Sequence, residues 1–258
     1  MDLHLNDTIV LIAGSSRGIG LATAIAFLQE GAKVMITGRD ADALSAATDS
    51  LAASHDKKRV LSFAGDMCDP AVIKNCLNEL RAAWGDPACV VANVGKGRLP
   101  KDSQYDAEQW AETFRLNFQG SVALAQAVLP AMTKRKNGSI VFTSSIAGVE
   151  GIGAPLPYAA AKAALIAYAK GLAAQVGNQG VRVNCVAPGN ILFPGGSWDQ
   201  RIQENKKGIA NYIQEHVPMN RFGTPEEIAN LIVFLSSDRS SFTTGACFVA
   251  DGGQTASL

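Results

Sequence analysis

The sequence predicts a single α/β domain: a doubly wound sheet of about seven parallel strands with helices on both faces. Short, continuous apolar runs alternate with helix-length segments from one end of the chain to the other. Continuous apolar strands separated by helices are typical of a parallel sheet that is buried on both faces. The length of 258 residues suits one domain of this class, and no repeat or linker divides it, so we treat residues 1–258 as one unit.

Seven apolar runs are predicted as strands. In chain order they are residues 8–13, 33–37, 60–64, 88–92, 139–143, 181–186 and 246–249. The first helix is expected from about Ile19 to Gln29, because Gly31 closes it. Two later helix starts are marked by Asp69-Pro70, an N-cap followed by proline, and by the capping-box spacing of Thr224 and Glu227.

One stretch, from Asn190 to about residue 207, is predicted to be irregular. It contains Pro194-Gly195-Gly196, which combines a rigid turn former with two permissive residues. Long loops inside compact domains are usually functional, so we expect a substrate loop or lid at about residues 190–216. Trp198 would then close over the substrate. The alternative is a permanently ordered loop whose Trp198 fills the core or a subunit contact.

Composition and charge exclude several classes of protein. Hydrophobic residues make up 47% and charged residues 18%, which excludes a disordered chain. Lys+Arg and Asp+Glu are 23 each, and a zero net charge argues against a nucleic-acid binder or a membrane-surface protein. Neither a membrane span nor a signal peptide is expected. The five cysteines lack CxxC spacing and the three histidines are scattered, so we expect no disulfide framework, no metal site and a cytoplasmic location.

A glycine-rich turn joins the first strand to the first helix. Gly14, Gly18 and Gly20 follow the spacing G-x-x-x-G-x-G. Glycines permit positive φ and close approach to a ligand, and the free N–H groups at the helix start suit a pyrophosphate, as in Rossmann-type folds. An ordinary glycine-rich turn is the alternative, but its position directly after the first strand favours a dinucleotide site.

The second strand ends in Thr37-Gly38-Arg39, with no acidic residue at its tip. An acid there would bind the ribose 2′-OH, whereas an arginine accommodates a 2′-phosphate. Arg39 offers a fork of donors matched to phosphate, and Arg17 could reach the same group. The sequence therefore predicts NADP(H) in preference to NAD(H). The alternative is a solvated Arg39 beside an Asp40 that caps the next helix.

These motifs, with several that follow them, resemble the short-chain dehydrogenase/reductase family over essentially the whole chain. AGSSRGIG at 13–20 matches the family's glycine-rich element, ANVG at 92–95 stands where the family has NNAG, and YAAAK at 158–162 matches its YxxxK pair. Ser145 lies thirteen positions before Tyr158, the usual family spacing, and Pro188-Gly189 follows the sixth strand. Each element alone is weak, but all of them in order are strong evidence.

The resemblance implies a set of site residues. The catalytic residues would be Asn117, Ser145, Tyr158 and Lys162. The cofactor would contact Gly14, Ser16, Arg17, Gly18, Ile19, Gly20, Arg39, Asp66, Met67, Asn93, Gly95, Tyr158, Lys162, Pro188, Gly189 and Ile191. Within this set, Asp66 looks like the family's acid that contacts the adenine amino group, although an ordinary loop aspartate is the alternative.

Carbonyl reduction needs a proton donor and fixed hydrogen-bond donors for the developing alkoxide. Tyr158 and Lys162 are four residues apart and share one helix face, so the ammonium is expected to lower the tyrosine pKa from about 10. Ser145 would donate to the substrate oxygen, with Ser144 as an alternative assignment. In the family, the lysine also holds the nicotinamide ribose, and the residue matching Asn117 holds a water that links it to solvent.

Some positions depart from the family pattern. Ala13 and Ala92 replace polar residues, and Phe193 stands where the family often has a threonine that bonds the nicotinamide carboxamide. The backbone of Ile191, or Asn190, would then have to hold that group. Phe193 and Trp198, with Phe222, are expected to wall a substrate pocket, and Lys96 and Arg98 could meet an anionic substrate group or be solvated.

The leading functional prediction is an NADP(H)-dependent alcohol dehydrogenase or carbonyl reductase acting on a small molecule, with a 3-oxoacyl thioester as one possible substrate. A sugar or polyol oxidoreductase is the second enzyme prediction. A non-catalytic NADP(H)-binding sensor or scaffold is the prediction from another class. The resemblance also implies a homotetramer, or else a dimer, built partly from the helices that carry Asn117 and Tyr158.

Overall fold

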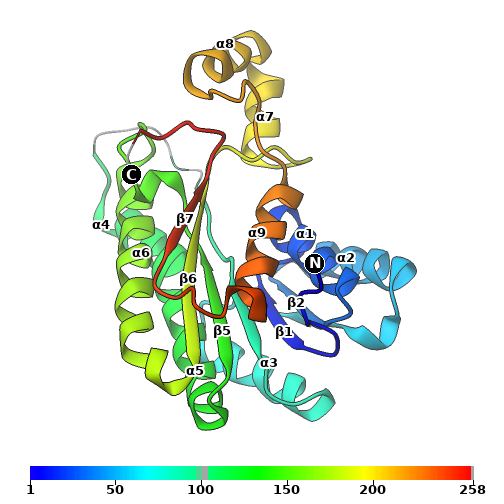
Figure 1. Cartoon of the computed structure of the whole chain (residues 1–258). Helices are drawn as coiled ribbons and strands as arrows, with labels where there is room; N and C mark the ends of the chain where they lie inside the picture. Colours follow the sequence, from blue (N-terminus) through cyan, green and yellow to red (C-terminus); the bar gives the residue numbers. More distant parts are fainter. Residues whose placement is uncertain (98, 100–103, 257–258) are drawn as a thin grey trace.

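The computed structural model describes residues 1–97, 99 and 104–256. Its strands form one seven-stranded parallel sheet in the order β3-β2-β1-β4-β5-β6-β7 (Figure 1). The strands are β1 (Ile9–Ala13), β2 (Lys33–Gly38), β3 (Val60–Ala64), β4 (Cys89–Ala92), β5 (Gly138–Thr143), β6 (Val181–Pro188) and β7 (Cys247–Ala250). Every predicted strand is confirmed, with differences only at the strand ends.

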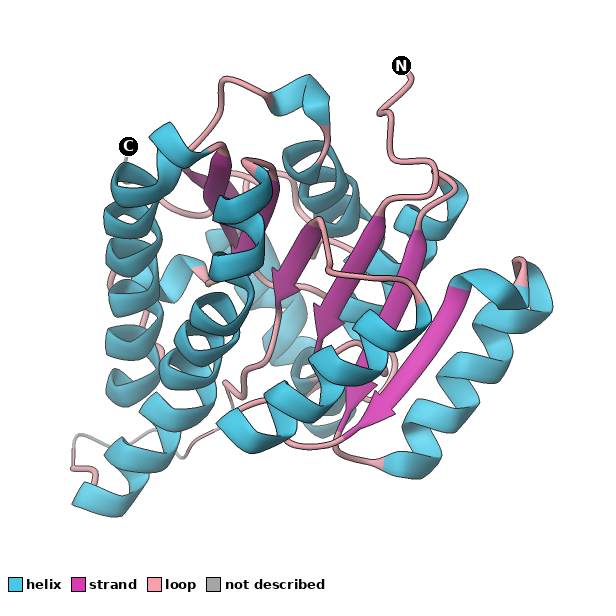
Figure 2. Cartoon of the chain, turned by 90° about the horizontal axis from the view of Figure 1, so that it is seen from below, coloured by secondary structure: helices cyan, strands magenta, loops and turns pink. Residues whose placement is uncertain are grey.

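Helices cover both faces of this sheet (Figure 2). The helices are α1 (Gly18–Gln29), α2 (Ala41–Ser54), α3 (Pro70–Ala83), α4 (Ala107–Phe114), α5 (Gly120–Arg135), α6 (Leu156–Val176), α7 (Ser197–Glu204), α8 (Lys206–His216) and α9 (Pro225–Ser236). The start signals are confirmed as well: the Asp69 side chain accepts from the N–H of Ala71, and Thr224 and Glu227 form a capping box. None of the helices in the described part of the chain is both long and apolar enough to cross a membrane.

Each strand contributes to two hydrophobic cores, one on either face of the sheet. In β1, Leu11 packs on one face with α3, α5 and α6, while Val10 and Ile12 pack on the other with α1, α2 and α9. Successive strand side chains point to opposite faces, so a strand buried on both sides must be apolar throughout. This is why the strands could be recognised as continuous apolar runs.

The prediction of an irregular stretch up to about residue 207 is wrong, because α7 and α8 occupy most of it. Neither helix buries a residue completely, and in α8 the helical spacing of Ile209, Tyr212 and Ile213 is a signal that the prediction overlooked. Figure 1 shows both helices standing beyond the carboxyl ends of the strands, away from the body of the sheet. Whether they move as a lid stays a prediction.

Candidate active site

The glycine turn lies where the carboxyl ends of β1 and β4 meet, the point at which the strand order reverses. Gly14 and Gly18 have φ of 69° and 56°, in the left-handed region that favours glycine. A Cβ on Gly20 would lie 2.3 Å from the carbonyl oxygen of Gly14. The turn therefore needs glycine for its backbone shape and for the close approach of α1.

Hydrogen bonds tie this turn to β1, to β2 and to Asn93, which follows β4. Asn93 Nδ2 donates to the carbonyl oxygen of Gly14 at 2.9 Å. Ser15 Oγ donates to the carbonyl oxygen of Ile12 at 2.7 Å, and the Thr37 N–H donates to Ser15 Oγ at 2.8 Å. These hydrogen bonds stabilise the turn in place of the polar side chains that Ala13 and Ala92 lack.

A groove runs from this turn to the tip of β2, and we call it the Arg39 groove. It encloses about 590 Å³, within the range typical of ligand sites. Of the residues predicted to contact cofactor, it is lined by Gly14, Ser16, Arg17, Gly18, Ile19, Arg39, Asp66, Met67, Asn93 and Gly95. Gly20 is buried beneath the turn instead. Asp40 caps α2 by accepting from the N–H of Ala43 at 3.0 Å, which leaves Arg39 without a carboxylate partner in the described chain.

Asp66 is held in the Arg39 groove by Arg115, which lies between α4 and α5. Arg115 donates to its carboxylate at 2.9 Å and pairs with Glu112 at 2.6 Å. Burial would raise the pKa of Asp66, but the hydrogen bonds from Arg115 and from the N–H of Cys68 outweigh it and hold that pKa below its ordinary value. The carboxylate is therefore ionised and fixed. The sequence analysis missed Arg115, which is 49 positions from Asp66.

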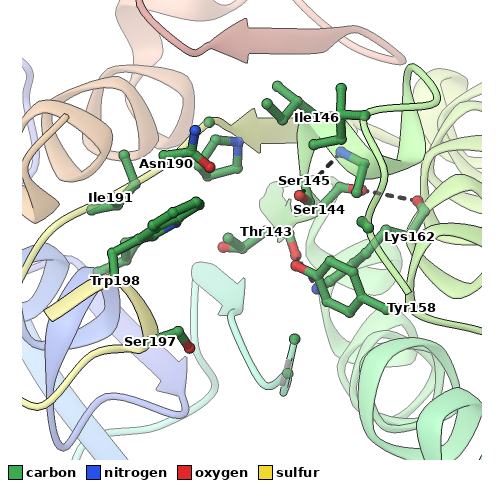
Figure 3. Close-up of a pocket in the computed structure, with 18 of the residues that line it drawn as sticks. Thr143, Ser144, Ser145, Ile146, Tyr158, Lys162, Asn190, Ile191, Ser197 and Trp198 are labelled. Carbon is green, nitrogen blue, oxygen red and sulfur yellow. Dashed lines mark hydrogen bonds between the residues drawn. The ribbon is translucent and has the colours of Figure 1, made fainter. Parts of the chain in front are cut away.

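A second cavity, the Tyr158 pocket, adjoins the groove and encloses about 330 Å³. Its predicted residues are Ser145, Tyr158, Lys162, Pro188, Gly189, Ile191, Phe193 and Trp198. Figure 3 shows Tyr158 and Trp198 on opposite sides of the open space. Asn93 and Gly95 line both cavities, so a ligand can extend from one into the other.

Tyr158 and Lys162 lie together on α6, as predicted. Lys162 Nζ is 5.9 Å from the Tyr158 ring centroid and donates to the carbonyl oxygen of Thr143 at 2.8 Å. Lys162 is only 4% exposed, and this burial lowers its pKa to about 8.

The pKa of Tyr158 moves in the direction opposite to the prediction. Burial raises it, and only a hydrogen bond with Ser145 opposes that rise. The ammonium of Lys162 is directed at the Thr143 carbonyl instead of stabilising the phenolate.

The structure distinguishes Ser145 from Ser144. Ser144 Oγ donates to the carbonyl oxygen of Lys162 at 2.9 Å, so its proton is already used (Figure 3). Ser145 Oγ accepts from the N–H of Ala147 at 3.2 Å, which leaves its proton available beside Tyr158. This geometry favours Ser145 for the predicted role.

Asn117 lies behind the pocket, in a π-helical turn (Arg115–Gln119) between α4 and α5. Its amide donates to the carbonyl oxygens of Thr113 and Lys96 and accepts from the Lys96 N–H at 3.0 Å. A Cβ on Gly95 would lie 2.8 Å from Asn117 Oδ1 and 3.1 Å from Lys162 Nζ. Asn117 thus fixes the loop after β4 close to Lys162.

Aromatic side chains form the wall opposite Tyr158. The Phe193 ring lies against Gly18, where an added Cβ would be 2.8 Å from it. Trp198 packs on Phe222 with ring centroids 4.6 Å apart and on Tyr212 at 5.3 Å. Phe222 is buried behind Trp198 and does not line the pocket, so its predicted place in the wall is corrected.

Sequence reasoning missed two other features of this wall. Asn190, Tyr212 and Gln254 form a hydrogen-bonded cluster. Arg201 lies over the Trp198 ring at 4.7 Å, three residues along α7. Recognising α7 as a helix would have revealed that pair.

Two basic residues, Lys96 and Arg98, were predicted near the substrate, and Lys96 does not line the Tyr158 pocket. Lys96 lines the Arg39 groove instead. Arg98 lies outside the described residues.

Residues 13–255 match the family model described as Enoyl-(Acyl carrier protein) reductase. The 2-(S)-hydroxypropyl-CoM dehydrogenase 3 of Xanthobacter autotrophicus is 34% identical, over 99% of this chain and 100% of the relative. The 3-oxoacyl-[acyl-carrier-protein] reductase of Escherichia coli is 35% identical, over 97% and 98%. The structure of L-sorbose reductase from Gluconobacter frateurii, complexed with NADPH and L-sorbose, superposes with a TM-score of 0.93 at 33% identity, covering 100% of both chains.

Proposed function

We propose a function for this chain, which belongs to the short-chain dehydrogenase/reductase family and is an oxidoreductase of CH–OH and C=O groups with a nicotinamide cofactor. It prefers NADP(H) and interconverts a small carbonyl compound and its secondary alcohol. Tyr158 acts as the acid in the reduction and as the base in the oxidation. The observation that carries the proposal is that Tyr158 and Ser145 face a pocket that opens into the Arg39 groove. A carbonyl in that pocket can meet both hydroxyl groups.

In the proposed reaction, NADPH supplies a hydride when bound, and NADP⁺ takes one up in the reverse direction. Tyr158 donates the proton that completes reduction of the carbonyl to an alcohol, and in the oxidation it accepts that proton. Ser145 donates a hydrogen bond to the same oxygen and stabilises its developing charge. Lys162, which donates to the Thr143 carbonyl and lies 5.9 Å from the Tyr158 ring centroid, is the residue that would hold the nicotinamide ribose.

The groove fits a phosphorylated dinucleotide. Gly14, Gly18 and Gly20 leave a backbone cradle that any Cβ would obstruct or strain. Arg17 and Arg39 both line the end near β2, and neither has a carboxylate partner among the described side chains. Two unpaired guanidinium groups at one end of the groove support NADP(H) over NAD(H).

For the substrate, a 3-oxoacyl thioester is the first candidate because a relative is a 3-oxoacyl-[acyl-carrier-protein] reductase. A sugar or polyol is the second, supported by the polar cluster of Asn190, Tyr212 and Gln254 and by the likeness to L-sorbose reductase. A non-catalytic sensor is not retained, since the chain belongs to a family of enzymes.

We also infer a homotetramer, or a dimer, in the cytoplasm. Leu156, at the start of α6, is 56% exposed and Phe242 is fully exposed, which supports burial of both in an assembly. The five cysteines are all unpaired, which suits a reducing compartment. Light scattering of the purified protein measures the assembly directly, and a monomeric mass would contradict it.

The test is Tyr158→Phe, assayed by NADPH absorbance against oxoacyl thioesters, ketones and sugars. Because only the proton donor is removed, kcat is expected to fall by about 10²–10⁴-fold while NADPH binding stays unchanged. Tyr168→Phe, which removes a hydroxyl elsewhere on α6, is the matched control and keeps its activity. Substantial turnover by Tyr158→Phe would refute the proton-donor role.

A further inference from the structure

Arg201 is unusual among the arginines of the described chain. Arg59, Arg81, Arg115 and Arg221 pair with carboxylates, and Arg135, Arg182 and Arg239 donate to backbone carbonyls. Only Arg17, Arg39 and Arg201 have side chains without a hydrogen-bond or carboxylate partner among the described residues. Arg17 and Arg39 line the Arg39 groove, whereas Arg201 lines the Tyr158 pocket. Among the arginines that the structure describes, unpaired guanidinium groups are thus confined to the two cavities.

No carboxylate among the described lining residues of the Tyr158 pocket offsets the charge of Arg201. Its described lining contains two cations, Lys162 and Arg201, and neither aspartate nor glutamate. The acid in the first turn of α7 is Asp199, whose carboxylate accepts from the N–H of Gly195 at 2.8 Å. A concave site lined by one sign of charge raises the local concentration of ligands of the opposite sign.

Arg201 is also held in place before any ligand arrives. Its guanidinium carbon lies 4.7 Å from the Trp198 ring, in a cation–π contact between residues three apart on α7. Such a contact uses the face of the guanidinium and leaves its N–H edges free. An oriented guanidinium with free edges can bind a carboxylate or a similar oxyanion with two hydrogen bonds.

A second donor belongs to the same wall of the pocket. The Tyr212 oxygen accepts from Asn190 Nδ2 at 3.3 Å and from Gln254 Nε2 at 2.8 Å. With both acceptor positions filled, the hydroxyl proton of Tyr212 is left to donate. Its ring stacks on Trp198 at 5.3 Å, so Arg201 and Tyr212 are both anchored to one indole.

We propose that the substrate carries an anionic oxygen group at the end remote from its carbonyl, and that Arg201, with the Tyr212 hydroxyl, binds that group. Carboxylate, sulfonate and phosphate share this chemistry. The inference rests on the proposed function, because it describes the other end of the same pocket: the carbonyl faces Tyr158 and the anion faces α7. Neutral ketones would then be poor substrates despite the aromatic wall.

The test compares matched substrates that differ only in charge. Oxo-carboxylates of increasing chain length, their sulfonate analogues and their neutral methyl esters are assayed with NADPH on the wild-type protein and on Arg201→Gln. We expect kcat/KM for the best charged substrate to exceed that of its ester at least tenfold, and Arg201→Gln to lower it by about 10–100-fold while the ester is unaffected.

Three further variants sharpen the result. Lys206→Gln removes an exposed charge at the start of α8 and should leave the preference unchanged, whereas Arg201→Lys keeps the charge and should recover it in part. Tyr212→Phe, which deletes only the hydroxyl, should weaken the charged substrates severalfold. Equal use of acids and esters by the wild type, or an equal loss of both in Arg201→Gln, would overturn the proposal.

A binding measurement separates this proposal from the proposed function. Trp198 fluorescence is titrated with unreactive alkanoates and alkanesulfonates in the presence of NADPH, and Trp198→Phe identifies the signal. Saturable quenching that Arg201→Gln abolishes supports the anion site even if no carbonyl compound is reduced. Identical titrations of wild type and Arg201→Gln would refute the anion site even in an active reductase.

Discussion

The two walls of the active-site cleft are built by different physical means. On the sheet side, the glycine turn, Lys162 and Asn117 are fixed by buried backbone and hydrogen bonds. On the opposite side, α7 and α8 bury no residue completely and are held by ring stacking around Trp198 and Tyr212. Substitutions on the sheet side are therefore expected to disturb the core, whereas substitutions on α7 and α8 are expected to cost less stability. This difference supports the proposal that the chemistry depends on the first wall and substrate choice on the second.

The largest effect on stability is expected at Lys162 on the sheet side, because its charge is almost fully buried. Its pKa of about 8 lies below the ordinary 10.5, so between these pH values the unfolded chain binds a proton that the folded chain does not. Burial of the charge therefore costs stability below pH 8, and this cost disappears as pH rises toward 10.5. Relative to Lys162→Met, the wild type should gain about 2–3 kcal/mol between pH 7 and pH 10.

Urea denaturation of both proteins at several pH values measures that gain. Lys170→Met, which removes an exposed lysine from the same helix, is the control and should follow the wild type. If the free energy of unfolding changed with pH equally in the wild type and in Lys162→Met, the cost of burying the ammonium would be offset by its surroundings and the prediction would be wrong.

Gly20→Ala tests the backbone fit of the same wall. The added Cβ would meet the carbonyl oxygen of Gly14 at 2.3 Å, and a backbone atom cannot move aside cheaply. We expect a loss of about 1–3 kcal/mol in the free energy of unfolding and much weaker NADPH binding.

The matched control is Gly171→Ala on α6, where an added Cβ meets nothing within 4 Å. There the substitution should stabilise the helix by about 0.5–1 kcal/mol. A Gly20→Ala protein that bound NADPH normally would contradict the assignment of this turn.

Arg39→Asp tests whether the groove recognises a 2′-phosphate. The change removes a charge-assisted contact worth roughly 1.5–3 kcal/mol and adds repulsion, so the preference for NADPH over NADH should fall at least tenfold. Binding of both cofactors is measured by fluorescence titration. Lys58→Asp, a charge reversal at an exposed residue before β3, should leave the ratio intact. Equal affinities in the wild type would refute the preference itself.

Trp198→Ala is expected to have the smallest effect on folding and a selective effect on substrates. Because α7 has no buried residue, the melting temperature should change by less than about 2 °C, while KM rises severalfold or the substrate preference shifts. NADPH affinity should stay nearly the same. By contrast, Phe27→Ala in the core should cost about 3–5 kcal/mol. If Trp198→Ala unfolded or dissociated the protein without changing its specificity, Trp198 would be structural and the comparison of the two walls would fail.

The features that depend on local rules could be predicted from the amino-acid sequence. Strands buried on both faces must be apolar throughout, as β1 shows, and positions with positive φ require glycine, as at Gly14 and Gly18. The spacing of Tyr158 and Lys162 placed them on one helix face. Such patterns lie within a few residues of each other, so they can be recognised without the fold.

The contacts between distant segments became visible only in the folded chain. Arg115 reaches Asp66 across 49 positions, and Gln254 reaches Asn190 across 64. Arg201 could be identified as a candidate site residue only from the structure, because helix α7 places it beside Trp198 on the lining of the Tyr158 pocket. The direction of the Tyr158 pKa was likewise decided by burial and by where the Lys162 ammonium points. Burial and electrostatic partners are properties of the packed chain, which is why sequence spacing alone could not determine them.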